Sequence, residues 1–308
     1  MRTAESAGGG LSRRPALAAV AGALCIAFSG IFVRLADVSP DTAAVVRCLF
    51  AVPILAMFAA GERRRYGPRT GRERLLAMVA GVFFALDLAF WHRSIEAVGA
   101  GLATVLGNLQ VVFVALAAWA VLGERPGATL LAAIPLALTG VVLISGVLED
   151  GAFGNDPVGG VVFGVLTSLA YTGFLLVLRH GNRDLRRPAG PLLDATATSA
   201  VAGAMIGLAL GTLDPTPGWP AIGWLILLAL TAQVAGWLLI SVSLPRLPAA
   251  VTSVLLTMQP VGAVVLAMVI LGEAPSALQL VGVALVLSGV VAVGLSRRQR
   301  TPVAEPVG

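Results

Sequence analysis

Charged side chains are scarce in this chain, and lysine is absent altogether. Only 12% of the 308 residues are Asp, Glu, Lys or Arg, whereas an average soluble domain carries roughly 25%. Hydrophobic residues make up 57% of the chain, and the mean hydropathy is +0.92. These values exclude an ordinary soluble protein and indicate an integral membrane protein.

Cysteine and histidine are equally scarce, with two of each. Cys25 and Cys48 fall inside apolar runs and suit small packing residues, not a disulfide framework. His92 and His180 stand on separate elements, so the sequence has no metal-ligand spacing. The glycine run at residues 8–10 lacks the lysine of a phosphate-binding loop, and nothing resembles an ATPase. We therefore expect no metal, no cofactor and no nucleotide-driven pump.

Long apolar runs dominate what is present. A helix needs about 20 apolar residues to cross the hydrocarbon of a bilayer, and ten runs meet this requirement. The predicted fold is an all-α integral membrane protein. Its ten transmembrane helices are expected at residues 15–36, 41–60, 75–94, 98–121, 127–147, 158–178, 191–211, 220–241, 249–271 and 277–295.

The basic residues, all 21 of them arginine, set the predicted orientation. With a cytoplasmic N-terminus, 18 of the 21 fall on the inner side, and only Arg93 with the acidic loop of residues 149–156 falls outside. The inner arginines are Arg2, Arg13, Arg14, Arg125, Arg246, Arg297, Arg298, Arg300 and those within residues 63–74 and 179–187. Because they are dispersed over loops and tails, we expect a lipid surface and no nucleic acid as their partner. The predicted location is a cell (inner) membrane, crossed several times, with both termini cytoplasmic.

An internal duplication connects the two halves of the chain. Residues 103–140 overlay residues 252–289 at a constant offset of 149. The register pairs Thr104 with Ser253, Asn108 with Thr257, Gln110 with Gln259, Glu124 with Glu273, and Gly140 with Gly289. Duplicated bundles of apolar helices are how many secondary transporters are built, with the site at the seam between the repeats.

Five helices per copy is an odd number, so the second copy must enter the membrane from the opposite side. We therefore predict two inverted five-helix repeats. The predicted parts are a cytoplasmic tail at 1–14, a first repeat at 15–147, an external connecting loop at 148–157, a second repeat at 158–295 and a cytoplasmic tail at 296–308.

A family resemblance rests on several motifs. Each half has a polar fourth helix that closes on Leu-Gly-Glu and a Gly-containing fifth helix, and the first half adds Arg47 in its second span. The stretch Phe84 to Arg93, running on to Gly107-Asn108-Leu109-Gln110, looks like the third and fourth helices of the EamA family. The chain thus resembles that family, part of the drug/metabolite transporter superfamily, over about residues 15–295.

The resemblance implies a ten-helix 5+5 inverted repeat that moves small solutes by alternating access. It implies no particular substrate, since relatives are associated with amino acids, nucleosides, sugars, quaternary amines and other metabolites. It also makes Glu124 and Glu273 candidates for packing at helix ends and gates. The second half departs from the pattern, because it lacks a counterpart of Arg47 and has Gln233 in place of an acid in its third helix.

Asp87 is the leading candidate for a functional residue. It lies about 12 residues into its span, where a carboxylate must face water, bind a proton or pair with a cation. Trp91 follows one turn later, and Gln233 with Trp237 repeats this spacing in the second half. A polar group beside an aromatic ring suits a solute that is partly cationic or partly apolar. The sequence leaves open whether Asp87 binds a proton or substrate ammonium, or is a structural partner of an arginine.

Two arginines fall inside the predicted spans near the outer side. Arg34 is close enough to the end of its span to reach the headgroups. Arg47 lies deeper, and it either neutralises Asp87 or anchors an anionic group such as a carboxylate. The sequence does not decide between these two roles.

Polar residues recur on the fourth and ninth spans. For Thr104 and Ser253 we favour hydrogen bonds that hold helices together. For Asn108, Gln110, Thr257 and Gln259 we favour the lining of a central cavity, because the duplication places them across one axis.

The predicted function is a secondary active transporter that exports a small metabolite or an amino-acid-like solute by alternating access, with proton entry as a candidate driving force. Two other functional classes are alternatives. A membrane-embedded enzyme using Asp87 and His92 is disfavoured, because their spacing puts them about 140° apart around a helix. A passive, channel-like bundle would give flux without saturation. His92 is expected at the membrane interface, and the sequence sets no oligomeric state.

Overall fold

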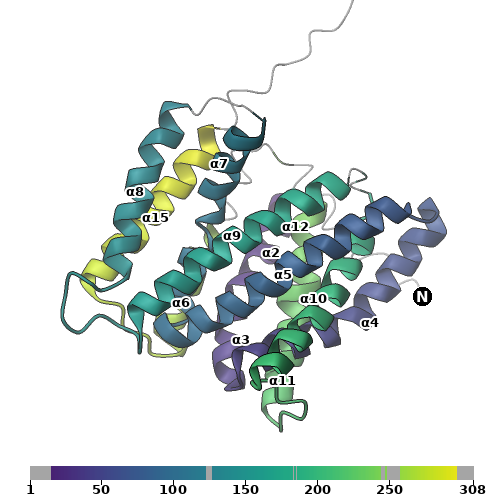
Figure 1. Cartoon of the computed structure of the whole chain (residues 1–308), viewed down its shortest axis with the longest axis horizontal. Coiled ribbons are helices and arrows are strands. Elements are labelled where there is room, and N and C mark those ends of the chain that lie inside the picture. Colours follow the sequence, from purple (N-terminus) through teal and green to yellow (C-terminus); the bar gives the residue numbers. More distant parts are fainter. Residues whose placement is uncertain are drawn as a thin grey trace, which may run out of the picture.

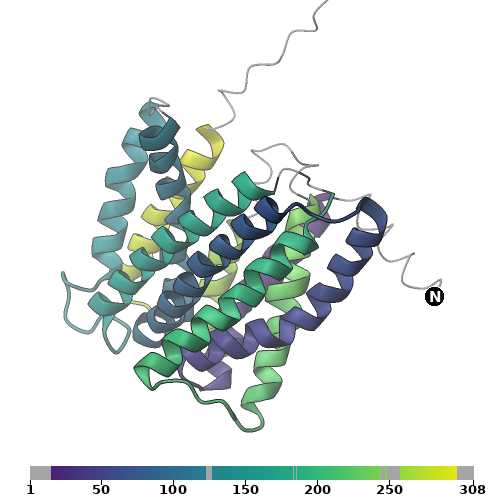
Figure 2. The same ribbon diagram turned by 45° about the vertical axis from the view of Figure 1, so that its right-hand side comes forward.

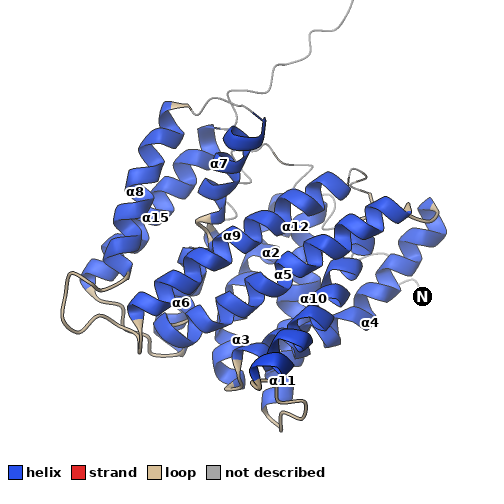
Figure 3. Cartoon of the chain, in the orientation of Figure 1, coloured by secondary structure: helices blue, strands red, loops and turns tan. Residues whose placement is uncertain are grey.

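The computed structural model describes residues 15–122, 127–182, 184, 186–243, 247 and 257–296. Within these ranges every regular element is a helix and no strand occurs (Figure 3). Glu124, Ser253 and residues 1–14 and 297–308 lie outside the described residues.

The helices follow one another along the chain with short connections. Their bounds are α2 Pro15–Ala27, α3 Ser29–Ala36, α4 Pro40–Tyr66, α5 Gly71–Val98, α6 Ala100–Gly107, α7 Gln110–Leu122, α8 Ala128–Ile144, α9 Pro157–Gly181, α10 Ala189–Leu210, α11 Ala221–Leu228, the π-helix η1 Ala229–Gly236, α12 Trp237–Ser243, α14 Met258–Ile270 and α15 Ala277–Ser296.

Seven helical stretches within the described ranges are long and apolar enough to cross a membrane. They run over 18 to 28 residues. Three of them combine neighbouring helices: α2 with α3, α6 with the first part of α7 as Ala100–Ala117, and α11 with η1 and α12. Three shorter apolar helices lie at Ala128–Ile144, Met258–Ile270 and Ala277–Val293. The predicted all-helical, multi-pass membrane protein is thereby confirmed.

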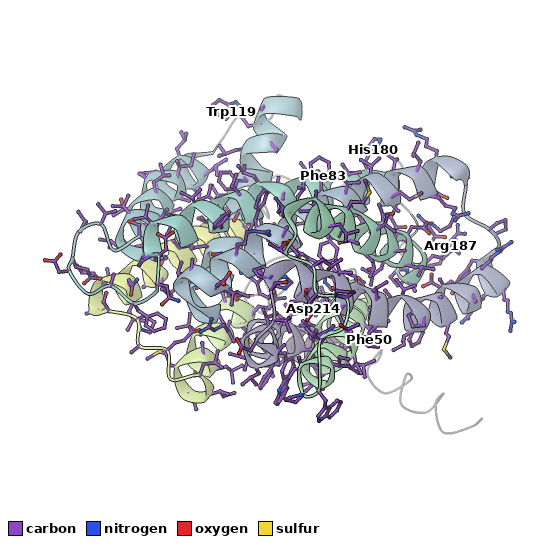
Figure 4. All side chains as sticks on the ribbon, turned by 60° about the horizontal axis from the view of Figure 1, so that its bottom comes forward. Phe50, Phe83, Trp119, His180, Arg187 and Asp214 are labelled. Carbon is purple, nitrogen blue, oxygen red and sulfur yellow. The ribbon has the colours of Figure 1, made fainter. Side chains whose placement is uncertain are left out.

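The outward surface of the bundle is apolar, as contact with lipid requires. Met57, Leu208 and Val269 are 76%, 69% and 77% exposed on three different helices. Figure 4 shows the labelled Trp119 and Phe50 pointing away from the ribbon. The buried faces carry many small residues instead, and small side chains let membrane helices approach closely.

Helices of the first half of the chain pack against helices of the second half. The most extensive pairs are α5 with α9, α8 with α15, α4 with α10 and α5 with α10, followed by α6 with α14 and α2 with α12. The α8–α15 pair forms one edge of the molecule in both views (Figures 1 and 2). The seam between early and late helices therefore runs through the whole bundle.

Glycines allow the α8–α15 pair to touch through its backbone. A Cβ atom on Gly140 would lie 2.6 Å from the carbonyl oxygen of Gly282, so only glycine fits there. A Cβ atom on Gly289 would lie 3.2 Å from the carbonyl oxygen of Ala133. The two contacts are equivalent in the duplication, because the 149-residue offset relates Gly140 to Gly289 and Ala133 to Gly282.

The fourth predicted span, 98–121, corresponds to an apolar stretch long enough to cross the membrane, but a turn at residues 108–109 divides it into two helices. α6 ends at Gly107 and α7 begins at Gln110. The amide of Asn108 donates to the carbonyl of Thr104 at 2.8 Å, while the Asn108 backbone N–H turns to Val105 at 3.1 Å. The side chain thus takes the place of a helical hydrogen bond. Thr257, the register partner of Asn108, lies in a turn directly before α14.

Candidate solute-binding cavity

A cavity of about 340 Å³ lies between the early and late helices, near the break that separates α6 from α7. This volume is at the small end of the range for ligand sites. Eight of the predicted site residues line it: Arg47, Asp87, Trp91, Asn108, Gln110, Trp237, Thr257 and Gln259. Gln233 does not line the cavity and lies fully buried behind its wall.

Asp87 is held at the cavity by the middle of α5, with its side chain 7% exposed. No ion pair or hydrogen bond joins its carboxylate to another residue that the structure describes. The backbone carbonyl of Asp87 accepts a hydrogen bond from the hydroxyl of Thr167 on α9 at 3.4 Å. A carboxyl group with cavity access, and with no direct ion pair or side-chain hydrogen bond among the described residues, is available to a proton or a cationic solute.

Arg47 approaches the cavity from α4 and is 4% exposed. Its Nη2 donates to Oε1 of Gln233 at 3.0 Å, and the Gln233 amide donates in turn to Thr196 at 3.1 Å. Nε and Nη1 of Arg47 have no hydrogen-bond partner among the described residues. The guanidinium carbon lies 5.9 Å from the ring centre of Trp91. Arg47 and Asp87 form no direct ion pair, so the arrangement leaves both charges facing the cavity region.

Gln110 and Gln259 both reach the cavity, from α7 and from the start of α14. Within the described part of the chain, no hydrogen bond occupies either side-chain amide. Thr104 also lines the cavity, but its hydroxyl donates to the carbonyl of Ala100 at 2.8 Å, one turn back on its own helix. Among the described residues, the Thr104 hydroxyl bonds only within its own helix.

Aromatic rings form one wall of the cavity. Phe84, Tyr171 and Trp237 come from α5, α9 and α12 and all line it. The rings of Tyr171 and Trp237 meet edge-on with centroids 6.1 Å apart, and Phe174 lies 5.6 Å from Trp237 behind them. Such a wall suits an apolar or cationic part of a solute.

Sequence reasoning missed the contribution of α9. Thr167 and Tyr171 line the cavity from this helix at i, i+4 spacing. Tyr171 is one of only two tyrosines in the chain, so an isolated tyrosine in an apolar span was the signal available. His92, expected at the interface, is 1% exposed and outside the cavity, with Nδ1 3.0 Å from the carbonyl oxygen of Pro40. Arg34 is exposed on α3 and makes no ion pair with Asp87.

Glu273 joins the two halves at the end of the bundle that contains the α5–α6 turn. Its carboxylate accepts hydrogen bonds from the backbone N–H groups of Ala100 and Gly101 at 2.6 and 3.1 Å. It therefore caps the N-terminus of α6 from the loop before α15. Burial raises the pKa of the Glu273 carboxyl, and these hydrogen bonds lower it in part. Gly99 has φ of +89°, which lets the chain turn beside this carboxylate.

A second contact at the same end of the bundle is an ion pair that was not predicted from the sequence. Arg93 Nη2 lies 2.7 Å from Asp41 Oδ2, and Arg93 Nη1 lies 3.0 Å from Asp41 Oδ1. Thr212, in the turn after α10, donates to the same carboxylate at 2.5 Å. Asp41 is 2% exposed, so the bidentate pair is largely desolvated. These contacts fix α4, α5 and the end of α10 together.

Comparisons with known proteins agree with this architecture. A model of the EamA-like transporter family matches residues 13–146 and 158–295. No curated protein matches the chain. A solved structure described only as the crystal structure of a protein has a TM-score of 0.61 and 16% identity, and the match covers 92% of this chain and 98% of that one. That identity shows a shared fold alone, whereas the family model spans nearly the whole chain. The chain belongs to the EamA family of transporters, in the drug/metabolite transporter superfamily.

Proposed function

We propose that this transporter exports a small metabolite or an amino-acid-like solute across a cell membrane by alternating access, with proton entry as the driving force. The observation that carries the proposal is the group of unpaired polar side chains at one small cavity. Asp87, Gln110 and Gln259 line it without side-chain partners among the described residues.

The chemistry of the cavity favours a solute with both charge signs and an apolar part. Asp87 offers an anion, and the buried guanidinium of Arg47 offers a cation with two unused nitrogen atoms. Tyr171 and Trp237 offer an aromatic wall. An ammonium at Asp87, a carboxylate near Arg47 and a side chain against the rings describe an amino-acid-like molecule.

Ten transmembrane helices in two inverted repeats form the framework of this proposal. The three shorter apolar helices, added to the seven long stretches, give the ten spans. The exchange of helix contacts supports the two-fold relation: α5 packs on α9 as α12 packs on α2, and α6 packs on α9 as α14 packs on α2. The paired glycine contacts of α8 and α15 support it independently.

The orientation that we propose places both termini in the cytoplasm of a cell (inner) membrane. Arginines of the α4–α5 and α9–α10 connections lie at one end of the bundle, where Arg187 contacts the carbonyl of Gly67 at 3.3 Å. That end is then cytoplasmic by the positive-inside rule. Glu273 and the Arg93–Asp41 pair close the opposite, external end in the described conformation.

The experiment that tests this function is transport by the purified protein in liposomes. Pooled metabolites, with single amino acids as separate samples, are presented with and without a pH gradient. We expect saturable movement of one solute class, accelerated by the gradient, and competition between its members. Flux without saturation or competition would instead indicate a passive bundle, and chemical conversion of a solute would indicate an enzyme.

A further inference from the structure

A second cavity, also of about 340 Å³, lies far from the solute cavity at the arginine-rich end of the bundle. It is formed where α4 ends, α5 begins and α10 begins. Four arginines line it: Arg63, Arg69, Arg74 and Arg187. Figure 4 labels Arg187 at the periphery of the molecule. None of the residues assigned to the solute cavity takes part.

The acidic residues of this second cavity are already engaged. Both carboxylate oxygens of Glu62 accept backbone N–H groups at the start of α10, each at 2.8 Å. Asp194 binds Arg69 at 2.6 Å and lies 3.7 Å from Arg74. The carboxylate of Asp194 thus interacts with two guanidinium groups. The cavity lining contains four arginines but only two acidic residues. The cavity carries a surplus of positive charge.

Two of these arginines are available to a ligand. The side chain of Arg74 is 63% exposed and is held only by its longer contact with Asp194. The exposed side chain of Arg63 forms no ion pair or hydrogen bond with the rest of the described chain. Arg187 is less available, because its Nε donates to Asp184 at 2.9 Å. Guanidinium groups match the geometry of phosphate oxygens, which they bind in a bidentate manner.

The other wall of the cavity is apolar and faces the lipid side. It consists of Ala56, Ala59 and Ala60 on α4 with Leu193 on α10. The neighbouring Met57 and Phe58 are 76% and 53% exposed, so this face of α4 is open to lipid. Small side chains leave a shallow slot directly beneath the arginines. A charged rim above an apolar slot fits an amphiphile, and a free anion would use only the rim.

We propose that this cavity binds an anionic phospholipid of the adjoining leaflet. Its phosphate contacts Arg63 and Arg74, and an acyl chain follows the alanine face of α4. The bound lipid would span the α4–α5 turn and the start of α10, and so would tie the two halves together at this end. Basic pockets between transmembrane helices are a recognised form of lipid site.

The test uses full-length protein purified in a neutral detergent. Phosphatidylglycerol, phosphatidylcholine and soluble glycerol phosphate are titrated separately, and bound ligand is counted by native mass spectrometry. The pocket variant is Arg63→Gln with Arg74→Gln. The matched control is Arg64→Gln with Arg72→Gln, which removes two exposed arginines of the same segment that do not line the cavity.

We expect the parent and the control to bind phosphatidylglycerol in preference to phosphatidylcholine. The pocket variant should bind phosphatidylglycerol at least about tenfold more weakly than the control, because it lacks both guanidinium groups that are available to the lipid phosphate. Equal weakening in both double variants would overturn the proposal in favour of diffuse attraction. Binding of glycerol phosphate as tight as that of the lipid would overturn it in favour of a soluble phosphate site.

Discussion

The two halves of the chain share a backbone plan but differ in charge. α4 begins at Pro40 and α10 at Ala189, so the 149-residue offset of the duplication extends to these helices. Asn108 lies in a turn shortly before α7, and its register partner Thr257 lies in a turn directly before α14. At the charged positions the correspondence fails, because the same offset leads from Arg47 to Thr196 and from Asp87 to Gly236.

The difference shows how a duplicated scaffold acquires an asymmetric site. Gln233, from the second half, accepts a hydrogen bond from Arg47 and donates one to Thr196, the register partner of Arg47. The second half thus supplies a neutral support for a charge that only the first half carries. η1 contains Gln233, and π-helical turns are frequent at functional sites. We infer that the two halves share their backbone plan, while the charged groups of the proposed binding site belong to the first half.

The largest expected effect tests whether the halves are inverted at all. Cys25 and Cys48 are replaced by Ala, and Asn155→Cys or Arg64→Cys is then introduced at an exposed position. We expect a membrane-impermeant thiol reagent to label position 155 in intact cells, and position 64 only after permeabilisation. An odd number of spans between the two positions requires opposite sides. Labelling of positions 64 and 155 from the same side would contradict the inverted repeat. Labelling of position 64 from outside and of position 155 only after permeabilisation would keep the inverted repeat but reverse the proposed orientation.

The next effect tests whether the charge asymmetry matters. Asp87→Asn keeps the size of the side chain and removes its charge, and Glu96→Gln is the matched control on an exposed face of the same helix. If Asp87 handles protons, the Asn variant should lose at least about tenfold of its gradient-driven rate, or about 1.4 kcal/mol, and keep solute exchange. If Asp87 is a fixed anion, the main change should be weaker binding of a cationic solute.

Transport by the Asn variant and the control is measured between about pH 5.5 and 8.5, where a carboxyl that exchanges protons must titrate. The absence of a direct ion pair between Asp87 and Arg47 favours proton or ammonium binding. An Asn variant with the parent's gradient-driven rate and apparent affinity throughout this range would remove Asp87 from the mechanism.

Sequence alone located most of the bundle, because apolar length and internal register are local properties. The all-helical, multi-pass fold followed from the apolar runs, and the cavity lies where the duplication pointed. The prediction that Gln233 lines the cavity was wrong. Its spacing from Trp237 is the same as that of Asp87 from Trp91, but Gln233 lies within the π-helix η1 and is buried behind the cavity wall. The Arg93–Asp41 ion pair was not predicted either. It joins two residues 52 positions apart on different helices, and the periodicity of a single helix carries no information about such a long-range contact.

The smallest expected effect concerns the positions where the halves agree most closely. Gln110→Leu and Gln259→Leu each remove one unpaired amide from the cavity, and a hydrogen bond to a solute is worth about 0.5 to 1.5 kcal/mol. Each variant should therefore raise the apparent Km by a few-fold to about tenfold while inserting normally.

Gln279→Leu provides the contrast, because the Gln279 amide donates to the carbonyls of Ile144 and Phe153 at 3.2 and 3.0 Å and lies outside the cavity. Loss of those bonds leaves buried backbone carbonyls without a hydrogen-bond donor. The Gln279→Leu variant should therefore lose thermal stability in detergent. Parent-like transport by both cavity variants, or poor insertion of both, would show that Gln110 and Gln259 pack helices as Gln279 does.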